Sequence, residues 1–117
     1  MAEPRTGDYD IVVRKRSTSP LDITYKSGGN PVDITGYTFA AQVYNKDRSV
    51  KYADYSVTYT NRSQGKVLFK LTPAQTETFN VPELEYDVKF RQPDGDEEYL
   101  IGGTIYVNEG YTVIPWV

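Results

Sequence analysis

The chain has no cysteine and no histidine among its 117 residues. Without cysteine there is no disulfide scaffold, no thiol nucleophile and no thiolate metal site. Without histidine the chain lacks the commonest general base and the commonest ligand of transition metals. We therefore expect no enzyme activity, no catalytic residue, no cofactor and no metal.

Long apolar runs and an excess of positive charge are also missing. No stretch approaches the roughly 20 apolar residues of a membrane helix or the h-region of a signal peptide. The residues Met1-Ala2-Glu3-Pro4 are typical of an untargeted cytoplasmic start. The net charge of −3 provides no general attraction to nucleic acid or to an anionic membrane. We expect neither as a partner.

Charged residues cluster in two places. Arg14 and Arg16 flank Lys15 in the only basic run, and no aromatic residue interleaves with them to stack on bases. We predict that Arg14 and Arg16 contact an acidic protein surface. The acidic cluster comprises Asp94, Asp96, Glu97 and Glu98. It fits either a calcium site, which needs converging oxygen ligands, or a solvated hairpin tip. We favour the tip, because no EF-hand spacing is present.

What the chain has in excess is tyrosine, with 11 residues. Tyrosine favours strands and carries a polar tip that suits half-buried or interface positions. Apolar residues alternate with polar ones along several short segments, which predicts half-buried strands separated by turns. These segments cover residues 10–15, 21–26, 39–44, 55–60, 67–71, 86–90 and 99–107. We expect Gly102 and Gly103 to mark a bulge in the last of them.

One helical turn interrupts the strands. Thr72 is a good N-cap, Pro73 suits the first helical position, and Gln75 completes a capping box. We predict a short helix near residues 73–79 that carries the chain from one sheet to the other.

The fold class is therefore all-β, an antiparallel sandwich of about seven to eight strands. The predicted divisions are a flexible segment at 1–8, a sandwich at 9–107 and an apolar arm at 108–117. The alternation predicts a core between the two sheets that contains Ile23, Phe39, Val43, Val57, Phe69, Leu71, Val88 and Phe90.

The C-terminal arm is anomalous because chain ends are usually polar. Residues 111–117 are apolar and include the only tryptophan. Such a segment packs on its own domain or docks on a neighbour, and both alternatives stay open. The candidate partner-binding residues on the arm are Tyr111, Val113, Ile114 and Trp116.

Four short motifs in order resemble a known family. The most informative is residues 30–39, Asn-Pro-Val-Asp-Ile-Thr-Gly-Tyr-Thr-Phe, in which Gly36 allows a bend before the next strand. The others are residues 9–14, Tyr-Asp-Ile-Val-Val-Arg, residues 71–76, Leu-Thr-Pro-Ala-Gln-Thr, and residues 86–88, Tyr-Asp-Val. Together they resemble the small immunoglobulin-like β-sandwich domains of tailed-phage virion proteins. These include the N-terminal domain of upper baseplate proteins and related tail, neck and fibre components.

The resemblance implies a structural virion protein that acts by protein–protein contacts. Its role would be that of a tail, baseplate, neck or capsid-associated adaptor or decoration subunit. Its partners would be other virion proteins and symmetric copies of itself. Its location would be the virion, with assembly in the host cytoplasm. The alternative, which surface tyrosines leave open, is a carbohydrate-binding adhesion module involved in host recognition.

Overall fold

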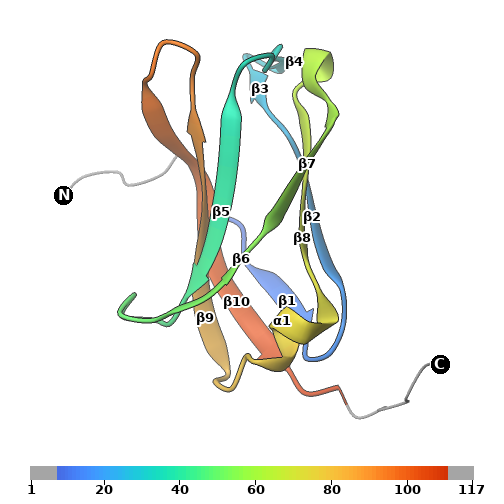
Figure 1. The fold of residues 1–117 in the computed structure, drawn as a ribbon, viewed down its shortest axis with the longest axis vertical. Helices are drawn as coiled ribbons and strands as arrows, with labels where there is room; N and C mark the ends of the chain where they lie inside the picture. Colours follow the sequence, from blue (N-terminus) through green and yellow to red (C-terminus); the bar gives the residue numbers. More distant parts are fainter. Residues whose placement is uncertain (1–7, 111–117) are drawn as a thin grey trace.

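The computed structural model describes residues 8–110, which form two sheets packed face to face (Figure 1). The larger sheet contains, in spatial order, β1 (Ile11–Arg14), β10 (Glu97–Asn108), β9 (Glu83–Arg91), β5 (Thr38–Tyr44) and β6 (Lys51–Asp54). The smaller sheet contains β2 (Ser19–Thr24), β8 (Lys66–Leu71) and β7 (Ser56–Asn61). A two-stranded hairpin joins β3 (Lys26–Ser27) to β4 (Asn30–Pro31). The all-β sandwich is confirmed.

The core lies between the two sheets, as the period-two pattern predicts. Six of the eight predicted core residues are buried, namely Phe39, Val43, Phe69, Leu71, Val88 and Phe90. Ile23 and Val57 are only half-buried and pack against the core. Both lie on the outer strands of the smaller sheet, β2 and β7, where one flank of the strand is open to solvent.

The sheets are antiparallel except at one edge. β1 pairs with β10 in the parallel direction, with Ile11 opposite Ile105 and Val13 opposite Val107. The predicted purely antiparallel arrangement is therefore wrong at this edge. The chain leaves β1 for β2, which belongs to the other sheet, so β1 has no hairpin partner. It is instead held along the last strand of the domain.

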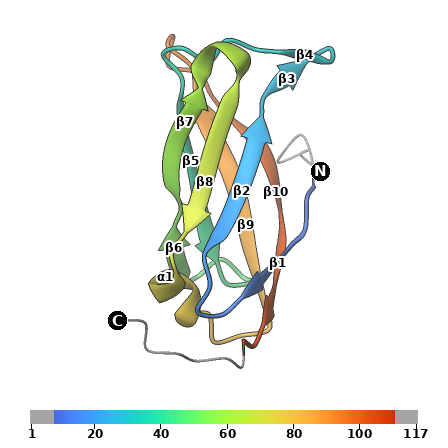
Figure 2. The ribbon, with the colours of Figure 1, turned by 90° about the vertical axis from the view of Figure 1, so that its right-hand side faces the viewer.

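The local sequence signals predicted the position of the helix correctly. Helix α1 (Pro73–Glu77) begins after Thr72, whose side chain accepts a hydrogen bond from the Gln75 backbone in a complete capping box. The helix ends two residues earlier than the predicted 79, with Thr78 as its C-cap. It connects β8 of the smaller sheet to β9 of the larger one, as predicted (Figure 2).

Residues 30–39 fill one end of the sandwich. Ile34 is fully buried, and Gly36 has a φ of 86°, which permits the bend expected there. The 3-10 helix η1 (Arg62–Gln64) packs beside this segment. Its Arg62 donates hydrogen bonds to the carbonyls of Ile34 at 3.1 Å and Tyr37 at 3.0 Å. These bonds fix the turn that leads into β5.

The predicted bulge is misplaced. The register of β10 against β9 shifts between Tyr99 and Ile101, before the two glycines. Gly103 has a different role: a Cβ atom there would lie 2.4 Å from the backbone oxygen of Tyr9. The glycine is needed because the segment before β1 runs beside β10 at close range. The hydroxyl of Tyr86 donates to that same Tyr9 oxygen at 2.5 Å.

Candidate interaction surface

The predicted acidic cluster is part of a charged hairpin tip. Asp94 accepts a hydrogen bond from the backbone N–H of Asp96 at 2.9 Å. Glu97 forms ion pairs with Lys89 at 2.9 Å and Arg91 at 3.8 Å. Within residues 8–110, no three carboxylates are placed so that they could hold one metal ion. No helix in the same range has the length and apolar character needed to cross a membrane.

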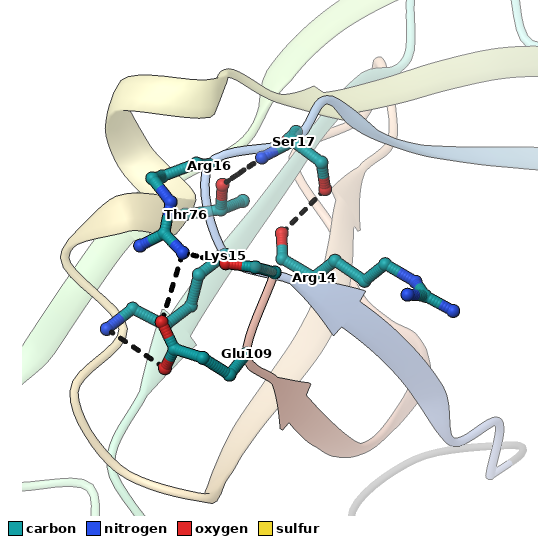
Figure 3. Close-up of polar contacts among 7 residues, drawn as sticks. Arg14, Lys15, Arg16, Ser17, Thr76 and Glu109 are labelled. Atoms are coloured by element: carbon teal, nitrogen blue, oxygen red, sulfur yellow. Dashed lines mark hydrogen bonds and ion pairs between the residues drawn. The ribbon is translucent and has the colours of Figure 1, made fainter. Parts of the chain in front are cut away.

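The basic run lies at the turn from β1 to β2, and its two arginines separate (Figure 3). The Arg16 guanidinium turns toward the end of β10, where Nη2 donates to Glu109 Oε2 at 3.0 Å and to the Gly110 carbonyl. Lys15 Nζ lies 3.8 Å from the other carboxylate oxygen of Glu109. The Arg14 side chain points away from this contact.

These contacts fix the positions of Glu109 and Gly110, which directly precede residues 111–117. Arg16 has a φ of 64°, an unusual backbone conformation for a side chain other than glycine. Its neighbour Ser17 donates its N–H to Thr76 Oγ1 at 3.1 Å, and the Thr76 hydroxyl donates to the Ser17 carbonyl at 2.9 Å. Thr76 is fully buried on α1. The turn, the helix and the start of the arm therefore form one connected unit, which we call the arm root.

Arg16 and Glu109 are 93 residues apart, so no local pattern predicted their pairing. The arginine holds the pKa of the Glu109 carboxyl below its ordinary value, chiefly through the hydrogen bond. The four arm residues predicted to bind a partner, Tyr111, Val113, Ile114 and Trp116, lie outside the described residues.

Three exposed apolar side chains lie along the β1 edge of the larger sheet. Tyr9 is 56% exposed, Val12 is 59% exposed, and Tyr106 is 42% exposed. Val12 and Tyr106 are direct partners in the β1–β10 register, so their side chains stand side by side on the outer face. We call these three residues the edge patch.

A groove runs beside the edge patch, between the open edges of β1 and β2. Its volume is about 450 Å³, and its walls are formed by residues 9–12 and 19–22. The two strands are the edges of different sheets on the same side of the sandwich (Figure 2). An extended segment lying there would contact both sheets.

A second hollow, of about 490 Å³, lies on the outer face of β5, β9 and β10. Tyr44 and Tyr99 both line it, together with Gln42, Asp87 and Lys89. The Tyr44 hydroxyl donates to Gln42 Oε1 at 2.9 Å, and Lys89 Nζ lies 5.1 Å from the Tyr99 ring centroid. Small Ala40 on β5 leaves room between these larger side chains.

Comparison with known proteins adds evidence on the fold. No protein-family profile matches the chain, and no curated protein matches it by sequence. Solved structures do match the fold of the chain. One is the N-terminal domain of phage TP901-1 ORF48, with a TM-score of 0.57 and 11% sequence identity. The alignment covers 87% of this chain and 98% of that domain. At this identity the likeness shows a shared fold.

Proposed function

We propose that this protein is a structural subunit of a tailed-phage particle that acts by protein–protein contacts. The observation that carries the proposal is the fold shared with the N-terminal domain of phage TP901-1 ORF48 over nearly the whole of that domain. The motif at residues 30–39, which carries the resemblance to phage domains, contains the buried Ile34 and the expected bend at Gly36.

The surface is consistent with an assembly role. Three of the exposed large apolar side chains gather at one sheet edge in the edge patch. Such clustering marks interaction sites more often than scattered single residues do. Residues 111–117 add a second apolar element, and the arm root fixes where that element begins. We propose that the arm docks on a neighbouring subunit, with Trp116 as its anchor.

The test is incorporation of the subunit into particles. Particles purified from cells that produce the phage should contain the full-length chain, detected by mass spectrometry and by density in electron microscopy. A chain that lacks residues 111–117 should fold with an unchanged melting temperature and be absent from the particles. Absence of the full-length chain from purified particles would refute the proposed function. A strongly lowered melting temperature of the truncated chain would show that the arm belongs to its own core.

A carbohydrate-binding role is the second candidate, and the hollow on β5, β9 and β10 favours it. Tyrosine faces beside carboxylate and amide groups suit the alternating apolar and polar surfaces of a sugar ring. Saturable binding on a glycan array that disappears in Tyr99→Ala, with no association with particles, would favour this second role. The assembly role predicts a blank array.

A further inference from the structure

We infer that the free edge of β1 receives the C-terminal arm, residues 111–117, of a second copy of this chain. The inference rests on the proposed function and names the partner and the receiving surface of the arm. The receiving surface consists of the edge patch, the backbone edge of β1 and the groove between β1 and β2.

The backbone of β1 pairs with β10 on one side and is open on the other. Tyr9 donates its N–H to Gly102, and Lys15 donates its N–H to Asn108, so the odd-numbered residues of this segment face β10. Successive peptide groups of a strand point to opposite sides, so those of Val12 and the N–H of Arg14 face the open edge. The Arg14 carbonyl is already paired, because it accepts a hydrogen bond from the Ser17 hydroxyl at 2.6 Å. An edge with unpaired N–H and C=O groups is a template for an added strand.

The exposed side chains at this edge indicate which segment could pair there. An added strand at this edge would lie over the groove of about 450 Å³ and beside Val12 and Tyr106. The chain has two terminal segments outside the described residues. Residues 1–7 include Glu3 and Arg5 and little apolar surface, whereas residues 111–117 carry no charged side chain. Only the second segment matches the exposed apolar side chains of Val12 and Tyr106 at this edge.

The arm can also form the required hydrogen bonds. Proline has no N–H, so Pro115 must face away from β1 in an added strand. Peptide groups alternate, so the N–H groups of Thr112, Ile114 and Trp116 then face β1. The single proline is therefore compatible with strand addition, and it restricts the free arm to fewer conformations before docking.

The direction of the strands decides whether the arm pairs with the β1 edge of its own chain or with that of another copy. Because β1 and β10 are parallel, both strands end at the same end of the sheet. To reach its own β1 edge, the arm would have to pass the turn after Arg14 and reverse its direction. Gly110 is held against that turn: Arg16 binds its carbonyl, and a Cβ on Gly110 would lie 3.0 Å from the Lys15 oxygen. A reversal takes about four residues, so the first residues of the arm would form a turn instead of pairing with β1.

An arm from another copy has no such constraint and needs no turn before it pairs with β1. The resulting contact is head-to-tail, since the arm of one chain meets the edge of the next. Contacts of this kind form closed rings or open filaments.

The test is a complementation experiment with two purified variants. Val12→Glu places a charge in the edge patch but keeps the arm, and deletion of residues 111–117 removes the arm but keeps the edge. Light scattering after size-exclusion chromatography should show self-association of the wild-type chain and monomers of each variant. An equimolar mixture of the two variants should form a species of two chains, because one intact edge meets one intact arm.

Two further variants provide a control and an expected size for the weakening of self-association. Val50→Glu is the matched control: Val50 is 51% exposed but lies in the turn before β6, at the opposite edge of the same sheet. It should self-associate like the wild type. Trp116→Ala should weaken self-association by about 30-fold, the usual effect of losing a tryptophan anchor.

The inference is overturned if the wild-type chain is monomeric at all attainable concentrations, if Val12→Glu associates as the wild type does, or if the two variants fail to combine. Binding to purified particles is measured separately on the same proteins. Particle binding by a chain that never self-associates would leave the proposed function standing and remove this inference. Self-association through the edge without any particle binding would support this inference and count against the proposed function.

Discussion

Replacement of Phe69 by alanine tests the packing of the two sheets. Phe69 lies on β8, the central strand of the smaller sheet, opposite Leu21 on β2 and Val57 on β7. Its side chain is 0% exposed. The ring meets Phe39 of the other sheet with a centroid distance of 6.4 Å and Tyr55 with a distance of 6.2 Å, both edge-on. The substitution therefore removes contacts within one sheet and between the two.

The expected cost follows from this environment. Truncation of a buried phenylalanine to alanine costs about 3–5 kcal/mol. Two edge-on aromatic pairs, each worth about 0.5–1.5 kcal/mol beyond area burial, place Phe69 in the upper part of that range. For a domain of this size, a loss of about 4 kcal/mol corresponds to a melting temperature lowered by about 15 °C.

Urea unfolding followed by circular dichroism measures the loss directly, and Val50→Ala serves as the exposed control. The control should change the free energy of unfolding by no more than about 0.5 kcal/mol. If Phe69→Ala does not fold, Phe69→Leu keeps most of the volume and should lose about 1–2 kcal/mol. A loss below about 1 kcal/mol in the free energy of unfolding of Phe69→Ala would refute the packing described here. Removal of a ring buried between two sheets should destabilise the domain by more than that.

Three further predictions test particular contacts. The hydroxyl of Tyr55 is buried without a hydrogen-bond partner in the described structure, and burial raises its pKa. Removal of an unsatisfied buried hydroxyl relieves a desolvation cost, so Tyr55→Phe should leave stability unchanged or raise it by about 1 kcal/mol in urea unfolding; a loss above that size would reveal a missed partner. Gly103→Ala should destabilise the domain by more than about 1 kcal/mol, because its Cβ would lie 2.4 Å from the Tyr9 oxygen; wild-type stability would contradict that close approach. The pKa of Glu109 is lowered by Arg16, so this carboxylate contributes stability above its ordinary pKa and loses the contribution as the pH falls through the lower folded value. The difference in urea midpoint between wild type and Glu109→Gln should therefore shrink in acid, and a constant difference would exclude the ion pair as its cause.

Local signals in the sequence predicted the local parts of the fold. The capping box at Thr72 and Gln75 placed α1, because helix caps depend on residues three positions apart. The alternation of Phe39, Ala41 and Val43 placed the buried face of β5, because strand side chains alternate. Each of these two signals depends only on residues that lie within a few positions of one another in the sequence.

The features that were missed depend on distant contacts. Residues 51–61 were expected to contain one strand, but the chain changes sheets at Tyr55, from β6 to β7. The parallel β1–β10 pairing and the Arg16–Glu109 contact join the two ends of the described chain. Neither leaves a pattern in a short window of sequence. The edge patch was missed for the same reason: Val12 alternates like a strand residue, and only the sheet order shows that its strand is an edge.

We propose that this chain is a structural subunit of a phage particle. The most direct measurement is electron cryo-microscopy of purified particles, made with the full-length chain and with a chain that lacks residues 111–117. We expect density for a two-sheet domain at symmetric positions in the first particles and its loss in the second. Particles made with the full-length chain that show no such density at any position would contradict the claim.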